Sequence, residues 1–535
     1  MARMESRDTV PQSVLVVGAG PTGLTLAAEL ARHGVTCRIV DSALAPAAQS
    51  RAIAIQARTL EIFSLMQLAD EFVAAGRPIH AANVYSGGRR IIHLGFDELD
   101  SAFPYLLILP QPETERILGD RLRQLGVQIE RGVELVSLSQ DTEKATAELR
   151  HPDHRTEYVR VDWVVGCDGA HSTVRRSLDI PFEGHTFDHT FVLADVHVTS
   201  SLSEDEAHIF SRHGDLCAIF PLGGGRYRIV ADNPPGSLAD RDPTIAECQK
   251  IVDERVDVPA VLSDAAWITA FRINSRMVRR LRSHRIFLAG DAAHIHSPAG
   301  GQGMNTGIQD SVNLAWKLAL VCNGHSDPSL LDSYESERYP VERAVLRQTD
   351  LILRVASASG GLGAFVREHV APLFGNLKFV QREVARVISE IEIEYEHSPI
   401  VEDHHVPHGP RAGDRAPDAI ARLAPDGRDV RILDVCSRPQ HTLLLVVETA
   451  DHVARAEELS RNVTARYPDV IAPVIVSDST SVPDGAPSAR SLRDEYGPSR
   501  PTVYLVRPDG YIGFRAPLTA SAKELMQYLT RLLPH

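Results

Sequence analysis

Two short apolar runs near the start of the chain are separated by a helical pattern. Ser13–Val17 and Thr36–Val40 are mainly apolar, which is typical of strands buried on both faces of a parallel sheet. Between them, apolar residues recur at helical spacing over Leu24–Ala31, and Gly34 stands where a helix C-cap is expected. The order strand, glycine-rich turn, helix, strand predicts a βαβ unit.

The pattern changes between about residues 190 and 280, where short runs alternate between apolar and polar positions. Thr190–Val198 and Tyr227–Val230 are two such runs. Alternation of this kind predicts antiparallel strands, so we expect a sheet inserted into the α/β domain. Arg285–Ala289 returns to the pattern of a buried strand, and a helix is expected from about Gln302 to Cys322.

The last part of the chain has the pattern of a separate α/β domain. From about residue 330 to 397 the pattern is helical, and residues 398–416 hold several His and Pro residues, as a linker does. Thr442–Val447, Ala472–Ser477 and Thr502–Val506 are strand-like and are separated by helix-like stretches.

Composition and charge exclude several classes of protein. The 535 residues carry 56 Lys and Arg against 70 Asp and Glu, and a net charge of −14 disfavours binding to nucleic acid. The six cysteines form no C-x-x-C, which excludes a zinc ribbon or a disulfide framework and fits a reducing cytoplasm. No apolar run approaches the roughly 20 residues that span a bilayer, and the polar first residues do not resemble a secretory signal. We therefore expect a cytoplasmic protein that binds neither nucleic acid nor membrane.

The turn after the first strand carries the pattern G-x-G-x-x-G. It consists of Gly18, Gly20 and Gly23, with Pro21 and Thr22 inside it. In such a turn the first glycine permits a tight bend, the second lets backbone N–H groups approach a diphosphate, and the third lets the helix pack on the strand. The N-terminus of the following helix favours the negative charge of the diphosphate.

An acid follows at the end of the second predicted strand. Asp41 stands 23 residues after Gly18, where its carboxylate can accept hydrogen bonds from both hydroxyls of a ribose. A carboxylate there disfavours a 2′-phosphate, so the pattern predicts bound FAD or NAD, and it does not distinguish between the two.

Further motifs carry a resemblance to a known family. CDGAHSTVR at Cys167–Arg175 and GDAAH at Gly290–His294 each follow a predicted strand. Together with the glycine-rich turn, with Ser50–Glu61 and with Gln111–Glu115, they resemble the single-component flavin-dependent aromatic hydroxylases, of which p-hydroxybenzoate hydroxylase is the type member. The run Gly290–Leu318 is similar to pentachlorophenol monooxygenase and to hydroxylases of aromatic polyketides. The resemblance covers about residues 13–400, and the C-terminal part also recurs in that subgroup.

The resemblance implies bound FAD and a set of residues that hold it. Asp291 would bind the ribitol chain, Arg51 and Gln111 would bind the flavin through their side chains, and the backbone near Met304 and Asn305 would contact the ring. Asp168 would serve both FAD and a transient nicotinamide coenzyme. The expected cofactor-binding residues are Gly18, Gly20, Pro21, Thr22, Gly23, Asp41, Arg51, Gln111, Asp168, Asp291, Gly303, Met304 and Asn305.

The implied activity is a monooxygenation. The resemblance predicts an enzyme that uses NADPH, or NADH, and O2 to hydroxylate a phenolic or polycyclic aromatic substrate through a flavin C4a-hydroperoxide. One alternative is a Baeyer–Villiger monooxygenase or a flavin reductase acting on polyketide-like rings. A second is a non-catalytic binding protein with the FAD fold. The oligomeric state stays open, with a homodimer as one possibility.

Residues that meet the substrate are harder to infer. His296 and Pro298 are weak candidates for catalysis, since the family places a proline carbonyl beside the reacting ring. In the predicted sheet, weak candidates for substrate binding are His213, Phe220, Tyr227 and Arg272. No catalytic base is identified, because Ala54 stands where some phenol hydroxylases have an acid. Asp291, His294 and His296 could pass for a metal cluster, but the chemistry needs no metal and none is expected.

The C-terminal part resembles a thioredoxin-like fold without its redox dithiol. Glu448–Asp451 stands where thioredoxins have C-x-x-C, and Cys436 is the sole cysteine in this part of the chain. We therefore expect a structural or oligomerisation role. The predicted fold is α/β: a Rossmann-like FAD-binding domain (residues 1–190 plus 280–330), an inserted antiparallel sheet for substrate (191–279), a helical segment (331–400), a linker (401–416) and the thioredoxin-like domain (417–535).

Overall fold

The computed structural model describes residues 13–212, 215–233, 241–298, 300–356, 378–424, 426–479, 490–497, 501–519 and 521–534. Its centre is a six-stranded, mainly parallel sheet in the order β18-β19-β12-β1-β2-β8. The strands are β1 (Val14–Val17), β2 (Cys37–Asp41), β8 (Ile129–Arg131), β12 (Trp163–Gly166), β18 (Arg282–Ser283) and β19 (Ile286–Leu288). β1, at the middle of the sheet, is fully buried, as its continuous apolar pattern predicts.

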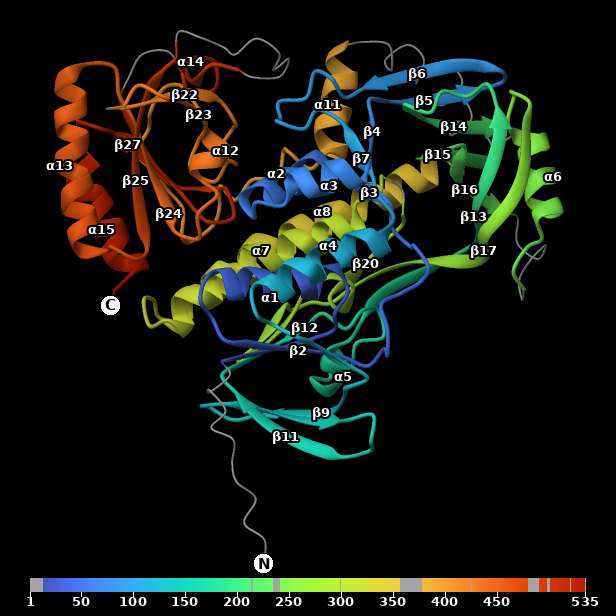
Figure 1. Ribbon diagram of the computed structural model, residues 1–535, viewed down its shortest axis with the longest axis horizontal. Helices are drawn as coiled ribbons and strands as arrows, with labels where there is room; N and C mark the ends of the chain where they lie inside the picture. The colour runs from blue at the N-terminus through green and yellow to red at the C-terminus, as the bar shows by residue number, and fades with distance from the viewer. Residues whose placement is uncertain are drawn as a thin grey trace, which may run out of the picture.

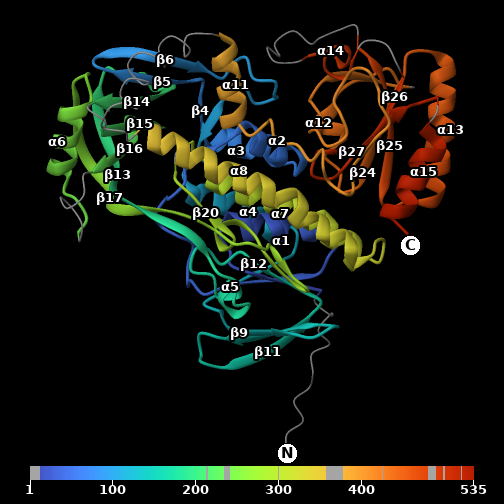
Figure 2. The ribbon, with the colours of Figure 1, turned by 180° about the vertical axis from the view of Figure 1, so that it is seen from behind.

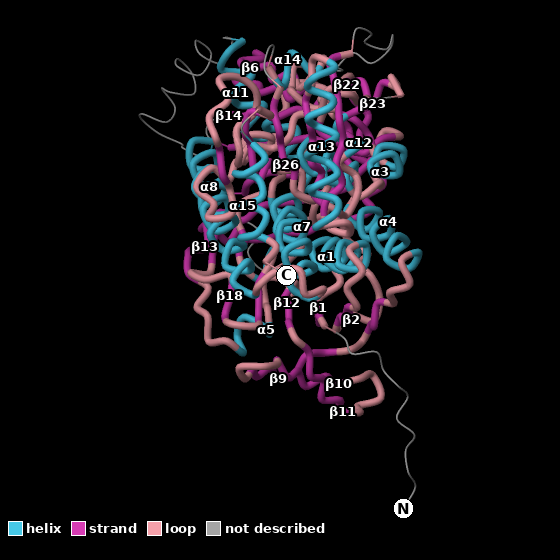
Figure 3. Tube along the Cα trace, turned by 90° about the vertical axis from the view of Figure 1, so that its left-hand side faces the viewer, coloured by secondary structure: helices cyan, strands magenta, loops and turns pink. Residues whose placement is uncertain are grey.

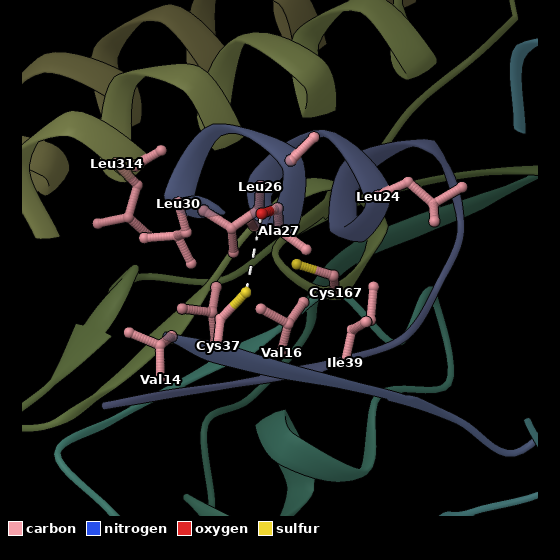
Figure 4. Packing of buried hydrophobic residues seen from close by; sticks show 14 of the residues in the cluster. Val14, Val16, Leu24, Leu26, Ala27, Leu30, Cys37, Ile39, Cys167 and Leu314 are labelled. Atoms are coloured by element: carbon pink, nitrogen blue, oxygen red, sulfur yellow. Dashed lines mark hydrogen bonds between the residues drawn. The ribbon is translucent and has the colours of Figure 1, made fainter. Parts of the chain in front are cut away.

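Helices cover this sheet on one side. They are α1 (Pro21–Arg32), α4 (Gln111–Gln124) and α7 (Gly303–Cys322), and α1 packs against both of the others. Figure 4 shows Leu26 and Leu30 of α1 between the strands and Leu314 of α7. On the other side, the three-stranded sheet β9 (Glu134–Gln140), β10 (Ala145–Arg150) and β11 (Thr156–Val161) lies at the far end of the molecule, beyond β12 and the short helix α5 (Thr173–Ser177) (Figure 3).

An eight-stranded sheet stands beside this domain, at the upper right of Figure 1, in the order β20-β17-β13-β16-β15-β14-β5-β6. Its strands are β5 (Ala81–Ser86), β6 (Arg89–Gly95), β13 (Glu183–Ser200), β14 (Glu206–Arg212), β15 (Asp215–Gly223), β16 (Arg226–Asn233), β17 (Ala260–Met277) and β20 (His294–Ile295). Helix α6 (Ile245–Arg255) covers its outer face. The sheet extends beyond the predicted residues 191–279, because β13 begins at Glu183, β5 pairs with β14, and β6 pairs with β5.

Smaller elements connect the two sheets. α2 (Ala57–Leu65), α3 (Ala69–Ala75) and the three-stranded sheet β3 (Ala54–Ile55), β7 (Leu106–Ile108) and β4 (Arg77–Ile79) lie between them. The 3₁₀ helices η1 (Gly290–Ala292) and η2 (Pro328–Leu331) flank α7. Helix α8 (Asp332–Ala356) contacts α7 and reaches β17 of the eight-stranded sheet, in the middle of the view from behind (Figure 2), and α11 (Lys378–Ile388) packs on β6.

The C-terminal domain is a seven-stranded mixed sheet in the order β21-β27-β26-β24-β25-β22-β23. The strands are β21 (Glu402–Asp403), β22 (Ile420–Leu423), β23 (Asp429–Arg431), β24 (His441–Val446), β25 (Ile471–Asp478), β26 (Thr502–Val506) and β27 (Ile512–Pro517). Its helices are α12 (Ile432–Val435), α13 (Ala450–Arg466), α14 (Leu492–Tyr496) and α15 (Ser521–Leu532).

The predicted linker 401–416 is wrong in part, because this segment is built into the domain. β21 pairs with β27, and Asp403 accepts hydrogen bonds from the side chain of Arg515 and from the backbone of Ala412. The side chain of Arg415 is buried and forms ion pairs with Glu61 and Asp100 of the N-terminal domain. Its charged residues therefore find partners within the fold, whereas a linker would have left them in solvent.

Candidate functional site

The glycine-rich turn between β1 and α1 forms a cradle at the N-terminus of α1. Gly18 has φ +103°, and a Cβ there would lie 2.3 Å from the carbonyl oxygen of Cys167. A Cβ on Gly23 would lie 1.9 Å from the carbonyl oxygen of Gly18, whereas a Cβ on Gly20 would meet no atom within 4 Å. Packing within the protein thus requires the first and third glycines. The second faces open space at a helix N-terminus, which is where an anion such as a diphosphate binds.

Pro21 and Thr22 form the first turn of α1. Pro21 opens the helix, where its missing N–H costs nothing. Thr22 lies against Gly290 and Gly307, since a Cβ on either would be 2.5 Å from Thr22 Oγ1. Ser311 of α7 also donates a hydrogen bond to the carbonyl oxygen of Thr22 (2.7 Å). The starts of α1 and α7 and the segment that carries Asp291 therefore meet at Thr22.

Asp41 lies at the carboxyl end of β2, at the rim of the cradle. Its carboxylate accepts hydrogen bonds from the backbone N–H groups of Ala19 (2.6 Å) and Ala43 (2.7 Å), and Arg131 Nη1 lies 3.4 Å away. The position after the second strand is the one expected for a residue that binds a ribose.

Two further carboxylates, Asp168 and Asp291, lie near the cradle. Asp168 Oδ2 accepts from the backbone N–H groups of Thr173 (2.7 Å) and Val174 (3.1 Å), but its Oδ1 is buried without a hydrogen-bond partner among the described residues. Asp291 is accessible to solvent, yet burial raises the pKa of its carboxyl group, against the positive charges of His294 and Arg51. A buried carboxylate oxygen without a hydrogen-bond partner, like the Oδ1 of Asp168, suits a polar ligand.

The segment from Ser50 to Gln56 is fastened to the domain by two side chains. Gln111 Oε1 accepts from the backbone N–H of Ala52 (3.3 Å), and its Nε2 donates to Glu115 (2.8 Å). Asn305, which is fully buried, accepts from the backbone N–H of Gln56 (2.9 Å) and donates to the carbonyl oxygens of Ala54 (2.9 Å) and Gly301 (2.7 Å).

These contacts refine the expected roles of the flavin residues. The side chains of Gln111 and Asn305 bind the protein itself, so they shape the segment that carries Arg51. The side chain of Arg51 is exposed and has no hydrogen-bond partner among the described residues. Gly303 begins α7, and Met304 packs against the core of the N-terminal domain. The positive charge of Arg51 acts on the carboxyl group of Asp291, so these two charged side chains lie near each other.

His294 belongs to a buried cluster of charges. Its Nε2 lies 2.8 Å from Asp310 Oδ2 and 3.7 Å from Glu342 Oε1, and Arg338 Nε donates to Asp310 Oδ1 (2.7 Å). Burial alone would lower the pKa of His294, but Glu342 and Asp310 raise it to about 9. The ligand atoms of His294, Asp310 and Glu342 lie within 4.8 Å of one another, as in a metal site. Because Arg338 and the protonated His294 already supply the positive charges, we interpret the cluster as ion pairs.

His296 and Pro298 lie between this cluster and the start of α7. His296 Nδ1 faces the carbonyl oxygen of Ser297 (2.8 Å), which can only accept, so Nδ1 carries the proton. Its Nε2 is buried without a described partner near Gly303, and burial lowers the pKa of the ring to about 4. His296 is therefore a neutral ring with an unused acceptor. The carbonyl oxygen of Pro298 accepts from the backbone N–H of Gly301 (2.9 Å), which leaves one lone pair.

Strand alternation separates the candidates on the eight-stranded sheet. Phe220 faces the N-terminal domain and packs on a cluster that contains Ile53 and Leu106. Tyr227 faces the other way, into the core beneath α6, and is a packing residue. Arg272 is exposed and lies opposite Thr190 on β13. Val192, two positions further along β13, packs into the core beneath α6, so Thr190 and Arg272 lie on the α6 side of the sheet. His213 lies outside the described residues.

The structure adds a charged pair that the sequence did not single out. Arg228 and Asp195 form a two-point ion pair on the same face as Phe220, at 2.7 Å for each hydrogen bond. Arg228 Nη1 also donates to the carbonyl oxygen of Arg51 (3.4 Å). The alternation along β16 could have indicated it, because successive side chains point to opposite faces and Tyr227 points into the core beneath α6.

The parallel sheet, the cradle and the free carboxylates together define a dinucleotide-binding protein of the Rossmann type. Residues 12–349 match the FAD binding domain family, and residues 409–534 match the C-terminal domain of aromatic-ring hydroxylases. The chain belongs to the flavin-dependent aromatic-ring monooxygenases, which confirms the family predicted from the motifs.

Relatives of known activity match almost the whole chain. The 6-methylpretetramide 4-monooxygenase of Streptomyces rimosus is 36% identical and covers 93% of this chain and 90% of its own length. The pentachlorophenol 4-monooxygenase of Sphingobium chlorophenolicum is 32% identical, with 95% and 94% covered. Among solved structures, the anhydrotetracycline hydroxylase of Streptomyces rimosus superposes with a TM-score of 0.77 at 28% identity, covering 98% of this chain and 100% of that one. The described helices include none that is long and apolar enough to cross a membrane.

Proposed function

We propose that the chain hydroxylates a phenolic or polycyclic aromatic substrate at the expense of NADPH, or NADH, and O2. Bound FAD would accept the hydride, activate O2 and deliver one oxygen atom to the ring. The second oxygen atom leaves as water, with one proton taken up and the nicotinamide coenzyme released oxidised. The observation that carries the proposal is that the inner face of the eight-stranded sheet bonds directly to the segment of Arg51, beside the dinucleotide cradle.

The chain's own residues would hold the cofactor in three places. The turn of Gly18, Gly20, Pro21 and Gly23 would bind the diphosphate, and Asp41 would bind the adenosine ribose. Asp291 and Arg51 would meet the ribitol chain and the flavin ring, and the free Oδ1 of Asp168 would accept from the cofactor or the coenzyme. Gly303, Met304 and the backbone of Asn305 begin α7, whose N-terminal dipole favours negative charge on the reduced ring.

The substrate would lie between this ring and the sheet. Phe220, Ile53 and Leu106 give that region an apolar lining, which suits an aromatic ring. The carbonyl oxygen of Pro298 and Nε2 of His296 are the acceptors we propose for a phenolic hydroxyl. The names of the relatives include a chlorinated phenol and tetracyclic polyketides, and we extend this range to the present chain.

The experiment is a survey of substrates with the yellow holoenzyme. NADPH oxidation is measured alone and with simple phenols, halophenols and polycyclic phenols, together with O2 consumption and product mass. We expect slow oxidation without a phenol and a severalfold rise with the right one. The reaction should consume about one O2 per NADPH and add one oxygen atom to the product.

Two results would contradict the proposal. If a cyclic ketone, and no phenol, raises the rate and yields a lactone, the enzyme is a Baeyer–Villiger monooxygenase. If the purified protein neither holds nor binds flavin, it is a binding protein with the FAD fold.

We propose that the C-terminal domain is thioredoxin-like and structural. Its central strands follow the order β27-β26-β24-β25-β22, and Cys436 is its single cysteine. Burial raises the pKa of the Cys436 thiol to about 12, which suits a packed side chain and not a redox group. We further propose a cytoplasmic location, where NADPH is supplied.

A further inference from the structure

His294 lies in a buried group of charges next to the turn that carries Asp291. It follows Asp291 by three residues, and its side chain is 1% exposed. Asp310 Oδ2, on α7, accepts from His294 Nε2 (2.8 Å) and from the backbone N–H of Gly290 (3.0 Å). Its Oδ1 accepts from Arg338 Nε of α8 (2.7 Å). One carboxylate therefore binds the ring of His294, a cation of α8 and the turn of Asp291.

Glu342 of α8 also faces His294, but it does not balance the positive charges. Its Oε1 lies 3.7 Å from His294 Nε2, and neither of its carboxyl oxygens has a hydrogen-bond partner among the described residues. A fully buried carboxylate without hydrogen bonds is too costly, so this carboxyl group is protonated. Burial accordingly raises the pKa of Glu342, against the positive charge of His294.

The other titratable groups that act on these charges are neutral near pH 7. Burial raises the pKa of one acid, two phenols and a thiol, and it lowers the pKa of a second imidazole. These groups are Glu390, Tyr334, Tyr395, Cys167 and His296. The buried group thus holds two cations, Arg338 and His294, and one anion, Asp310, so that one positive charge remains without a buried counter-ion.

Asp291 is the anion on which that remaining charge acts. Burial raises the pKa of its carboxyl group, whereas the positive charges of His294 and Arg51 oppose this rise. Arg175 of α5 also reaches the turn, where it donates to the carbonyl oxygen of Ala292 (2.8 Å), but its charge acts on Asp168. A ligand that covers Asp291 excludes water from it, and the charge of His294 then counts for more.

We propose that His294 is a positioning residue whose positive charge, held by Asp310, keeps the carboxylate of Asp291 ionised when FAD covers it. The inference rests on the proposed contact between Asp291 and the ribitol chain. Hydroxyl groups donate to an ionised carboxylate about twice as strongly as to a neutral acceptor. Without the charge of His294, Asp291 takes up a proton at a higher pH, so the affinity for FAD declines at a higher pH.

The test measures the dissociation constant for FAD between about pH 5 and pH 8 in the wild type, in His294→Gln and in a control, His208→Gln. His208 is a buried histidine of β14 whose ring lies against Tyr85 Oη (3.4 Å) and the carbonyl oxygen of Ser203 (3.0 Å), on the eight-stranded sheet. His294→Gln should move the decline in FAD affinity upward by about one pH unit, a tenfold loss of affinity on the acid side. His208→Gln should leave the profile unchanged.

An unchanged profile in His294→Gln would overturn the inference. So would a loss of affinity that is equal at every pH, because His294 would then only support the fold. Should His294→Gln fail to fold, Asp310→Asn removes the charge that holds the proton of His294, and the same shift is expected.

Asp291→Asn separates the inference from the proposals on which it rests. This side chain cannot ionise, so FAD binding should be weaker and independent of pH, and adding His294→Gln should change it no further. If Asp291→Asn binds FAD as tightly as the wild type, the ribitol contact and the inference both fail. The proposed hydroxylation is tested separately, by the stimulation of NADPH oxidation by phenols in the wild type. If that stimulation is missing, the pH profiles of FAD binding still decide the role of His294.

Discussion

Glu390 is a carboxylic acid buried completely in the loop after α11, beside the first turns of α7. Gln309 Nε2 donates to its Oε2 (2.5 Å), and Thr306 Oγ1 lies 3.4 Å from its Oε1. Burial raises the pKa of Glu390 from 4.5 to about 8, against the nearby positive charge of Arg338. The side chain is therefore protonated in the folded protein at neutral pH and ionised in the unfolded chain.

This difference predicts the direction of a pH effect on stability. Between pH 4.5 and about 8 the folded protein holds a proton that the unfolded chain has released, so Glu390 costs increasing stability as the pH rises. Glu390→Gln is neutral throughout, so it should raise the midpoint of thermal unfolding more at pH 8.5 than at pH 5. The control is Glu392→Gln, at a partly exposed residue paired with Arg386. Equal pH profiles for the two variants would contradict the prediction.

Residues whose position depends on local spacing could be predicted from the sequence. The glycines of the turn and Asp41 are separated by one strand and one helix, so the motif alone places them. Arg228 and Asp195 are 33 residues apart, and their pairing depends on the register of β13 against β16. The alternation along each strand gives the face of each side chain, but the residue of β13 that lies opposite Arg228 depends on pairing between strands that are not consecutive in the chain.

At the scale of elements, the packing of α1 against its neighbours separates two roles of glycine. A Cβ on Gly23 would clash with the backbone of Gly18, whereas a Cβ on Gly20 would enter open space. Gly23→Ala should therefore destabilise the fold, with a lower unfolding midpoint in the absence of FAD. Gly20→Ala should leave that midpoint nearly unchanged and weaken FAD binding, measured by flavin fluorescence. If both variants lose stability equally, the cradle at Gly20 is shaped by packing and not by a ligand.

Continuous elements were the easier ones to predict. The helix expected from about Gln302 to Cys322 is α7, Gly303–Cys322, because its apolar face runs without a break. The two strands β5 and β6 were not predicted as part of the substrate sheet, since they come far before β13 in the chain. Their place depends on the parallel pairing of β5 with β14, which is a long-range contact.

At the scale of the whole molecule, buried ion pairs join the C-terminal domain to the FAD domain. Glu337 of α8 accepts from Lys317 of α7 (2.7 Å) and from both arms of Arg507 (2.6 and 2.9 Å), which lies in the C-terminal domain. Arg507 also binds Asp509, which accepts from Trp316 Nε1 of α7 (3.0 Å). Although burial opposes it, Arg507 and Lys317 hold the pKa of Glu337 below its ordinary value.

Removing one member of this network should be costly for both domains. Arg507→Met leaves Glu337 and Asp509 buried with too little positive charge, so we expect a loss of about 3–5 kcal/mol in the free energy of unfolding. The control is Arg531→Met, at an exposed arginine of the same domain that pairs with Glu402. Denaturant unfolding followed by flavin release measures both. Equal stabilities would show that the domains do not depend on this network.

The network also concerns the order in which the parts of the protein are synthesised. Glu337 and Arg507 are 170 residues apart, so a growing chain exposes the whole FAD domain well before Arg507 leaves the ribosome. Until Arg507 is synthesised, Glu337 of α8 lacks one of the two cations that compensate for its burial. A chain that ends before the last strands therefore lacks Arg507, one of the two cations that bind the buried Glu337.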